Sequence, residues 1–232
     1  MSKIIYEIMH RENCVAQIST VGECKIYLED FMPYDLMLEE SNDFDKRIKN
    51  AMSFYSWCAS RMIPPDRTYA KEILNSIGAS QSVTDRDRAQ IALSYHCLSL
   101  LDVFWVKEEN EKVRFEDINL FAHSLSNALV DIALRGHQMT VTNAHLLAND
   151  LSTGGLYPKA WVRKEDGFYL YKDGGRDAVE REVLASKICR CFDCHQVLYE
   201  QGMFENEPVS ISKIMTSQRY SLVTYAAYDV YC

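Results

Sequence analysis

Three groups of residues in the last third of the chain have the types and the order needed to bind nucleotide phosphates. The small-residue loop Ser152-Thr153-Gly154-Gly155 would let backbone N–H groups approach phosphate oxygens, because larger side chains would block them. Lys172, at the end of an apolar run, would place a compact positive charge on those phosphates. Glu182, in the helix expected next, would pair with the lysine and hold it in place.

Glu180 is the alternative partner for Lys172. At about 100° per residue, side chains two positions apart on a helix diverge by about 200°, so only one of the two glutamates can face inward. We expect this to be Glu182. Each signal alone also has an ordinary structural explanation, since Gly-Gly pairs are common in turns and single Lys or Glu side chains usually face water. The glycine spacing is not that of a Walker loop or of G-x-G-x-x-G.

The elements around these residues are expected in the order loop, strand, turn, strand, helix, strand, strand. Alternating apolar residues and turn residues predict this order. The predicted segments are strands at Ala160 to Arg163 and Phe168 to Lys172 around the turn Glu165-Asp166-Gly167, a helix from Asp177 to about Arg190, strands at Gln196 to Glu200 and Val209 to Ile214, and an apolar run from Ser221 to Tyr225.

Short strands followed by helices are predicted before position 149. The strands are Ile4 to Met9, Cys14 to Ile18 and a third at Cys24 to Leu28; the helices are Asp43 to Arg61, Tyr69 to Ile77, Thr84 to about Leu98 and Phe115 to Arg135; Ser99 to Val106 is an apolar run expected to be buried. Thr84 is the expected N-cap of its helix. In the first helix, one apolar face is formed by Phe44, Ile48, Met52, Tyr55 and either Cys58 or Ala59.

Six blocks carry a resemblance to a known family. Leu151 to Val162 has a Gly-containing turn before Pro-Lys and an apolar strand, Phe168 to Gly175 has a lysine strand, and Glu180 to Lys187 has a Glu-containing helix. Upstream lie Ser60 to Arg67, Ser99 to Val106 and Phe115 to Phe121. Together, over roughly Ser60 to Tyr225, they resemble the bacterial HipA-like serine/threonine kinases. Arg181 stands where that family usually has Asn.

The resemblance implies an α+β fold in two parts. Residues 1–148 would form an N-terminal, mostly helical module with a short leading β-hairpin, and residues 149–232 a kinase-like small lobe with an antiparallel sheet plus one helix, ending near the hinge. ATP and Mg²⁺ are the implied cofactors, bound weakly or not at all without a second lobe. The implied nucleotide-binding residues are Ser152, Thr153, Gly154, Gly155, Lys172 and Glu182, with Ser152 or Thr153 as the position of a phosphorylation site.

Phosphoryl transfer also needs a catalytic Asp and Mg²⁺ ligands from a large lobe. Because this sequence ends at Cys232, we expect a truncated kinase that is not competent alone, with no catalytic residue in this chain. The alternative is a non-catalytic binding protein of a phage or mobile element that inhibits or regulates a larger partner protein. A protein partner or a homodimer is expected in either case.

The composition of the chain argues against nucleic-acid-binding, membrane, secreted and metal-binding proteins. The net charge of −8 argues against direct nucleic-acid binding, which needs a basic face. No apolar run reaches the roughly 18 to 20 residues that span a bilayer, so we expect a cytoplasmic protein without a membrane segment or secretory signal. Its eight cysteines are then expected as free thiols. Cys191, Cys194 and His195 have partial zinc-site spacing but lack a second ligand pair, so we expect no metal site.

Overall fold

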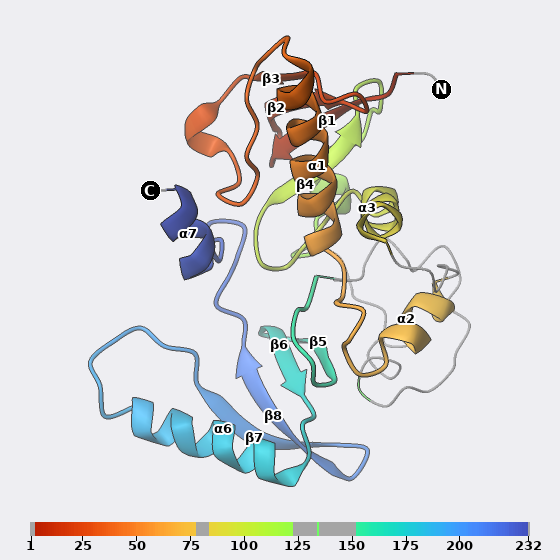
Figure 1. Cartoon of the computed structure of the whole chain (residues 1–232). Coiled ribbons are helices and arrows are strands. Elements are labelled where there is room, and N and C mark those ends of the chain that lie inside the picture. Colours follow the sequence, from red (N-terminus) through yellow and green to blue (C-terminus); the bar gives the residue numbers. More distant parts are fainter. Residues whose placement is uncertain (1–2, 78–83, 123–133, 135–151, 232) are drawn as a thin grey trace.

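The computed structural model describes residues 3–77, 84–122, 134 and 152–231. It has two four-stranded antiparallel sheets with helices against them, so the expected α+β class is confirmed (Figure 1). The first sheet has the order β3-β2-β1-β4, from β1 (Ile5–His10), β2 (Asn13–Ser19), β3 (Cys24–Ile26) and β4 (Phe104–Glu108). The second has the order β5-β6-β8-β7, from β5 (Lys159–Lys164), β6 (Gly167–Lys172), β7 (Tyr199–Phe204) and β8 (Glu207–Lys213).

The first sheet extends the predicted leading hairpin. β1 pairs with β2 on one side and with β4 on the other, where Met9 lies opposite Trp105. The apolar run Ser99 to Val106 was expected only to be buried, and its second half forms β4. Ile8 and Trp105 are both fully buried. The sheet therefore closes only when a segment almost a hundred residues downstream joins it.

Most helices begin where the sequence predicts them, whereas α7 (Tyr225–Tyr231) was not predicted. The helices are α1 (Phe44–Ser60), α2 (Ala70–Ser76), α3 (Asp85–Ser94), α4 (Phe115–Ile118), α6 (Arg176–Cys189) and α7, with a 3₁₀ turn η1 (Glu29–Phe31). Thr84 caps α3 as expected, and its side chain and that of Asp87 form a reciprocal capping box. α3 ends at Ser94 rather than near Leu98, because the backbone turns at His96 and Cys97, which both have positive φ.

The apolar face read from the sequence of α1 is buried only at its C-terminal end, where Cys58 is 0% and Ala59 2% exposed. Near the start of the helix Phe44 is 72% exposed, and Met52 is 67% exposed. The buried residues of α1 also include Phe54, Trp57 and the polar Asn50. Asn50 is accommodated because its amide donates to the carbonyl oxygens of Gly22 and Glu39 and accepts from the Glu39 N–H. The predicted helix is correct, and its apolar face is buried at Cys58 and Ala59 but exposed from Phe44 to Met52.

The long helix expected from Phe115 ends after one turn. α4 stops at Ile118 because Asn119 adopts an extended backbone (ψ 139°) and its side chain accepts from the Ala122 N–H. Most of the rest of that predicted segment, up to Arg135, lies outside the described residues.

The second sheet has four strands and one helix packed against it. α6 contacts β7 and β8, and the antiparallel sheet plus one helix agrees with the expectation for this region. The β7–β8 hairpin turns through Glu205 and Asn206, both at positive φ, as two-residue hairpin loops require. β7 begins at Tyr199, three residues later than predicted.

The hydrophobic core is shared between the two halves of the chain. One cluster joins Ile8 and Phe54 to Tyr171 and Val209, and a second joins Trp105 to Phe168. After β8 the chain also returns to the first half, where the Leu222 N–H donates to the Leu101 carbonyl. A domain boundary near residue 148 therefore stays a prediction. Among the described residues, no helix is long and apolar enough to cross a membrane.

Candidate functional site

One cross-strand row of polar side chains lies on the α6 side of the second sheet. Lys159 on β5 is opposite Lys172 on β6, which is opposite Ser210 on β8. Directly opposed residues of antiparallel strands project from the same face, with Cβ atoms about 5 Å apart. Two ammonium groups and a hydroxyl therefore emerge side by side at one end of the sheet.

Lys172 and Glu182 form the ion pair that the sequence predicts. The distance from Lys172 Nζ to Glu182 Oε1 is 3.0 Å, and both side chains are partly buried. The other carboxylate oxygen of Glu182 accepts a hydrogen bond from the Ser210 hydroxyl, and Ser210 is only 1% exposed. Glu180 points to solvent, which confirms the choice of Glu182 over its neighbour. α6 thus positions one glutamate against the lysine strand.

Tyr199 is a second partner of Lys172, and the sequence analysis did not find it. The ammonium donates to the Tyr199 hydroxyl at 2.7 Å and lies 4.2 Å from the ring centroid. Burial alone would lower the pKa of Lys172, but its hydrogen bonds to Tyr199 and Glu182 outweigh burial and raise that pKa. Lys172 is therefore a fixed positive charge.

Lys159 is the second site residue that sequence reasoning missed. Burial, followed by the charges of Arg67 and Lys172, lowers its pKa from 10.5 to about 8. Its ammonium donates to the Gly154 carbonyl at 2.5 Å. The hairpin register could have revealed it, because a two-residue turn pairs Lys164 with Gly167 and so places Lys159 opposite Lys172. The site carries more positive charge than its one glutamate balances.

Ser152 and Thr153 lie in the protein interior rather than in an exposed loop. They are 8% and 7% exposed. The Ser152 hydroxyl lies 2.6 Å from that of Ser99, and the Thr153 hydroxyl accepts from Arg67 at 2.6 Å. Both residues therefore anchor the loop to the N-terminal half, because their hydroxyl groups bond to Ser99 and Arg67 of the same chain.

Gly154 and Gly155 form the exposed part of the predicted loop. Gly155 has φ +94°, and a Cβ there would lie 2.6 Å from the Lys159 ammonium, so only glycine fits without strain. The loop ends beside β6, since the Asp173 N–H donates to the Pro158 carbonyl. The structure thus brings the two glycines to Lys159 and Lys159 to Lys172.

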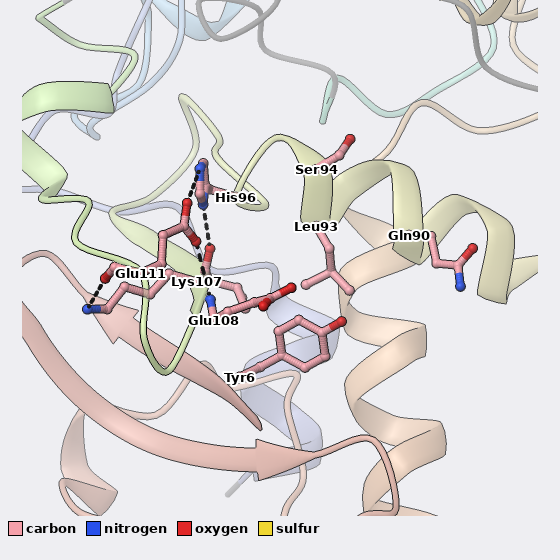
Figure 2. A pocket seen from close by; sticks show the side chains of 9 residues that line it. Tyr6, Gln90, Leu93, Ser94, His96, Lys107, Glu108 and Glu111 are labelled. Carbon is pink, nitrogen blue, oxygen red and sulfur yellow. Dashed lines mark hydrogen bonds and ion pairs between the residues drawn. The ribbon is translucent and has the colours of Figure 1, made fainter. Parts of the chain in front are cut away.

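A separate pocket of about 360 Å³ lies between the end of α3 and β4 (Figure 2). His96 spans it, with Nδ1 3.0 Å from the Val106 carbonyl and Nε2 3.5 Å from a Glu111 oxygen. Glu111 also accepts from the Glu108 N–H. These contacts brace the turn after α3 against β4. None of the site residues predicted from the sequence lines this pocket.

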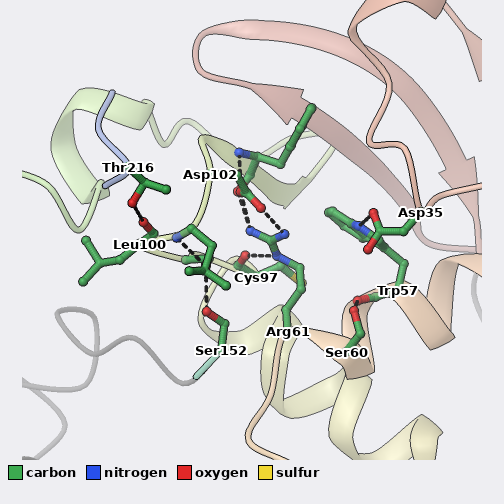
Figure 3. Close-up of polar contacts among 12 residues, drawn as sticks. Asp35, Trp57, Ser60, Arg61, Cys97, Leu100, Asp102, Ser152 and Thr216 are labelled. Carbon is green, nitrogen blue, oxygen red and sulfur yellow. Dashed lines mark hydrogen bonds and ion pairs between the residues drawn. The ribbon is translucent and has the colours of Figure 1, made fainter. Parts of the chain in front are cut away.

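A buried ion pair joins two of the sequence blocks that carry the family resemblance (Figure 3). Arg61 donates two hydrogen bonds to the Asp102 carboxylate, at 2.8 and 2.7 Å, and its guanidinium lies over the Trp57 ring. Beside it is a cavity of about 270 Å³ lined in part by Asp35 and Leu222. The polar groups of Arg61 are bonded within the protein, so we assign this pair a structural role.

The cysteine-rich segment after α6 forms no candidate metal centre. Cys189, Cys191 and Cys194 are exposed. Over the part of the chain that the structure describes, no three His, Cys, Asp or Glu side chains are grouped so that they could hold a metal ion.

Comparison of the chain with protein-family models and with curated proteins finds no match.

Proposed function

We propose that the second sheet and α6 form a nucleotide-binding lobe of the HipA-like kinase type, in which Lys172 contacts phosphate oxygens. The observation that carries this proposal is the 3.0 Å contact between Lys172 Nζ and Glu182 Oε1. In protein kinases a strand lysine is held by a helix glutamate in this way, so that its ammonium stays at the α- and β-phosphates.

The charge of the surrounding residues supports an anionic ligand. Lys159 and Lys172 emerge from neighbouring strands, and Arg67 is close enough to depress the pKa of Lys159. A polyphosphate would relieve this repulsion, because its charge compensates cations that the protein alone leaves in excess. The exposed glycines Gly154 and Gly155 lie beside Lys159, where backbone could approach phosphate oxygens.

The proposed activity of these residues is binding rather than turnover. In kinases the catalytic base and the Mg²⁺ ligands come from a second lobe, and the predicted site has no residue in those roles. Mg²⁺ would therefore arrive with the nucleotide. Lys172, Glu182 and Tyr199 would orient the phosphates, and affinity in this chain would be weak.

A Mg-ATP titration followed by thermal shift tests the proposal. The wild-type chain should show a saturable rise in melting temperature, and Lys172→Met should abolish it. Lys213→Met is the matched control, because Lys213 pairs with Asp166 on the opposite face of the same sheet. Its loss should leave the titration unchanged. No shift in the wild type, or equal loss in both variants, would refute nucleotide binding at this site.

A second candidate, a non-catalytic binding protein, is favoured by the exposed apolar face of α1. Phe44, Ile48 and Met52 line a groove of about 770 Å³. Exposed apolar surface at helical spacing is typical of sites that take a partner helix. Asp85 and Arg86 also line the groove, and Arg86 lies over the Tyr55 ring. The groove therefore fits an amphipathic helix of a partner protein whose apolar face is flanked by charged side chains.

Site-specific photo-crosslinking tests this second candidate. A crosslinking residue in place of Met52 should capture one partner, whereas the same residue in place of the exposed Glu180 should not. The purified partner should then bind the chain, and Ile48→Asp should weaken that binding at least tenfold, with Lys213→Asp as the control. Equal capture from both positions, or no effect of Ile48→Asp, would count against it. Capture of a second copy would identify a homodimer instead.

A further inference from the structure

Arg67, from the N-terminal half, bonds to both ends of the glycine loop, the segment 153–159 that contains Gly154 and Gly155. Arg67 Nη1 donates to the carbonyl oxygen of Thr153 at 3.1 Å and to its hydroxyl at 2.6 Å. Arg67 Nη2 donates to the carbonyl oxygen of Lys159. Arg67 is 4% exposed, so these bonds form away from competing water. Thr153 and Lys159 are the first and last residues of the loop, and a single planar group therefore sets their separation.

The backbone next to Arg67 also holds the loop. The Thr68 N–H donates to the Leu156 carbonyl at 2.9 Å, in the middle of the loop. On the other side of the loop, the Asp173 N–H donates to the Pro158 carbonyl at 2.8 Å, next to Lys172. The loop thus lies between the Arg67–Thr68 segment and the end of β6, and its carbonyl groups bond to both.

This placement fixes the Lys159 ammonium. Lys159 starts β5, so the Arg67 bond to its carbonyl fixes the backbone from which the side chain projects. The ammonium then bonds to the Gly154 carbonyl, inside the same loop. Arg67 also repels it electrostatically, which together with burial depresses the pKa of Lys159. The same arginine therefore fixes the backbone position of a site lysine and, after burial, contributes to its lowered pKa.

We propose that Arg67 is a positioning residue for the phosphate site: it holds the Thr153–Lys159 loop against β6 so that Lys159 stands beside Lys172 in the absence of ligand. The identity of the ligand, a polyphosphate, rests on the proposed function. The hydrogen bonds by which Arg67 holds the loop do not depend on it. Lysine cannot replace Arg67, because one ammonium cannot bond to acceptors at both ends of the loop in the fixed geometry of a guanidinium.

Hydrogen exchange in the ligand-free chain tests directly whether Arg67 holds the loop. The amides of Thr68 and Asp173 report on the loop because both donate to its carbonyl groups. Arg67→Lys should speed their exchange at least tenfold, while the Ile214 amide, which bonds to Phe168 in the same sheet, should be unchanged. Arg163→Lys is the matched control. Unchanged exchange at Thr68 and Asp173 in Arg67→Lys would overturn the proposal.

A milder variant covers the case in which Arg67→Lys fails to fold. Thr153→Val removes only the hydroxyl acceptor and should speed exchange at Thr68 relative to the wild type, whereas Thr153→Ser should keep the wild-type rate. Equal rates in Thr153→Val and wild type would also overturn the proposal.

Inorganic pyrophosphate and Mg-ATP then test the link to the ligand. Arg67→Lys should weaken both at least tenfold and should change the pH dependence of binding, which a purely structural role would leave unaltered. If the wild type binds neither probe, the proposed function fails. The exchange result still shows whether Arg67 holds the loop. If both probes bind equally well to Arg67→Lys, the hold of Arg67 on the loop has no role in binding and this inference is wrong.

Discussion

The carboxylate of Asp102 accepts two hydrogen bonds from the guanidinium of Arg61, forty-one residues earlier in the chain. Arg61 is 7% exposed, and it also donates to the carbonyl groups of Cys97 and Phe104. Burial would lower the pKa of Arg61, but the Asp102 charge holds it above its usual value. This ion pair ties the end of α1 to the segment that leads into β4.

Removing one partner of this pair should be strongly destabilising. Asp102→Ala leaves a buried guanidinium without its counter-charge, a change that costs about 3–5 kcal/mol. Urea unfolding should show a correspondingly lower midpoint. Asp117→Ala, which removes the partner of the exposed Arg114, should barely move the midpoint. If the two variants unfold at the same urea concentration, the Arg61–Asp102 pair is not the brace described here.

Loss of the Tyr199 hydroxyl should loosen Lys172 without removing the ring beneath it. Tyr199→Phe deletes a hydrogen bond to a charged group, which contributes about 1–3 kcal/mol. Because Tyr199 helps raise the pKa of Lys172, that pKa should fall in the variant. Lysine-selective NMR titration would measure it. An unchanged value would mean that Glu182 alone holds the ammonium.

Stability should rise with pH above about 8 because of Lys159. Its pKa is about 8 in the folded chain against 10.5 normally, so in this window the unfolded chain binds the proton more tightly. Unfolding then takes up a proton, and the free energy of unfolding increases with pH. Urea midpoints between about pH 7.5 and 9.5 should climb in the wild type and climb less in Lys159→Met. Parallel curves would show that Lys159 titrates normally.

A bound polyphosphate should raise the lowered pKa of Lys159, because its negative charge favours the protonated ammonium. Affinity for pyrophosphate should therefore fall as the pH rises through about 8, and binding at about pH 8.5 should take up protons. Calorimetry in buffers of different ionisation enthalpy measures this uptake. Lys213→Met should keep the uptake and Lys159→Met should lose it; uptake that persists in Lys159→Met would assign it to another group.

Gly22 should tolerate no side chain. Its φ is +78°, and a Cβ would lie 1.7 Å from the Arg47 carbonyl oxygen on α1. Gly22→Ala must displace α1 from the β2–β3 turn, at a cost of roughly 2 kcal/mol or more. Gly154→Ala is the control, because a Cβ added there would meet no heavy atom within 4 Å. A Gly22→Ala chain as stable as Gly154→Ala would contradict this close approach.

The Lys172–Glu182 pair could be predicted because local patterns determine both positions. An apolar strand ends at Lys172, and helical periodicity separates Glu182 from Glu180. The contacts of Arg67 with Thr153 and of Ser99 with Ser152 could not be predicted in this way, since they join residues 86 and 53 positions apart. Their placement depends on how the halves pack, which no local pattern encodes.

The burial of α1 could be predicted only in part, for a different reason. Its apolar face is buried at Cys58 and Ala59 but exposed from Phe44 to Met52. The buried face includes Asn50, which a hydrophobic pattern excludes but which hydrogen bonds to Gly22 and Glu39 satisfy. Such compensation depends on partners in other elements and is not visible within one helix.

The hydrophobic core that the two halves of the chain share affects folding during synthesis. Ile8 belongs to the same cluster as Val209, and β1 needs β4 at its edge. A ribosome releases β1 about a hundred residues before β4, so the edge of β1 stays unpaired in the interval, and Ile8 stays without Val209 for longer still. Folding would then be completed only after Val209 has been made, and a chaperone that shields the early strands would raise the yield more than one that acts after release.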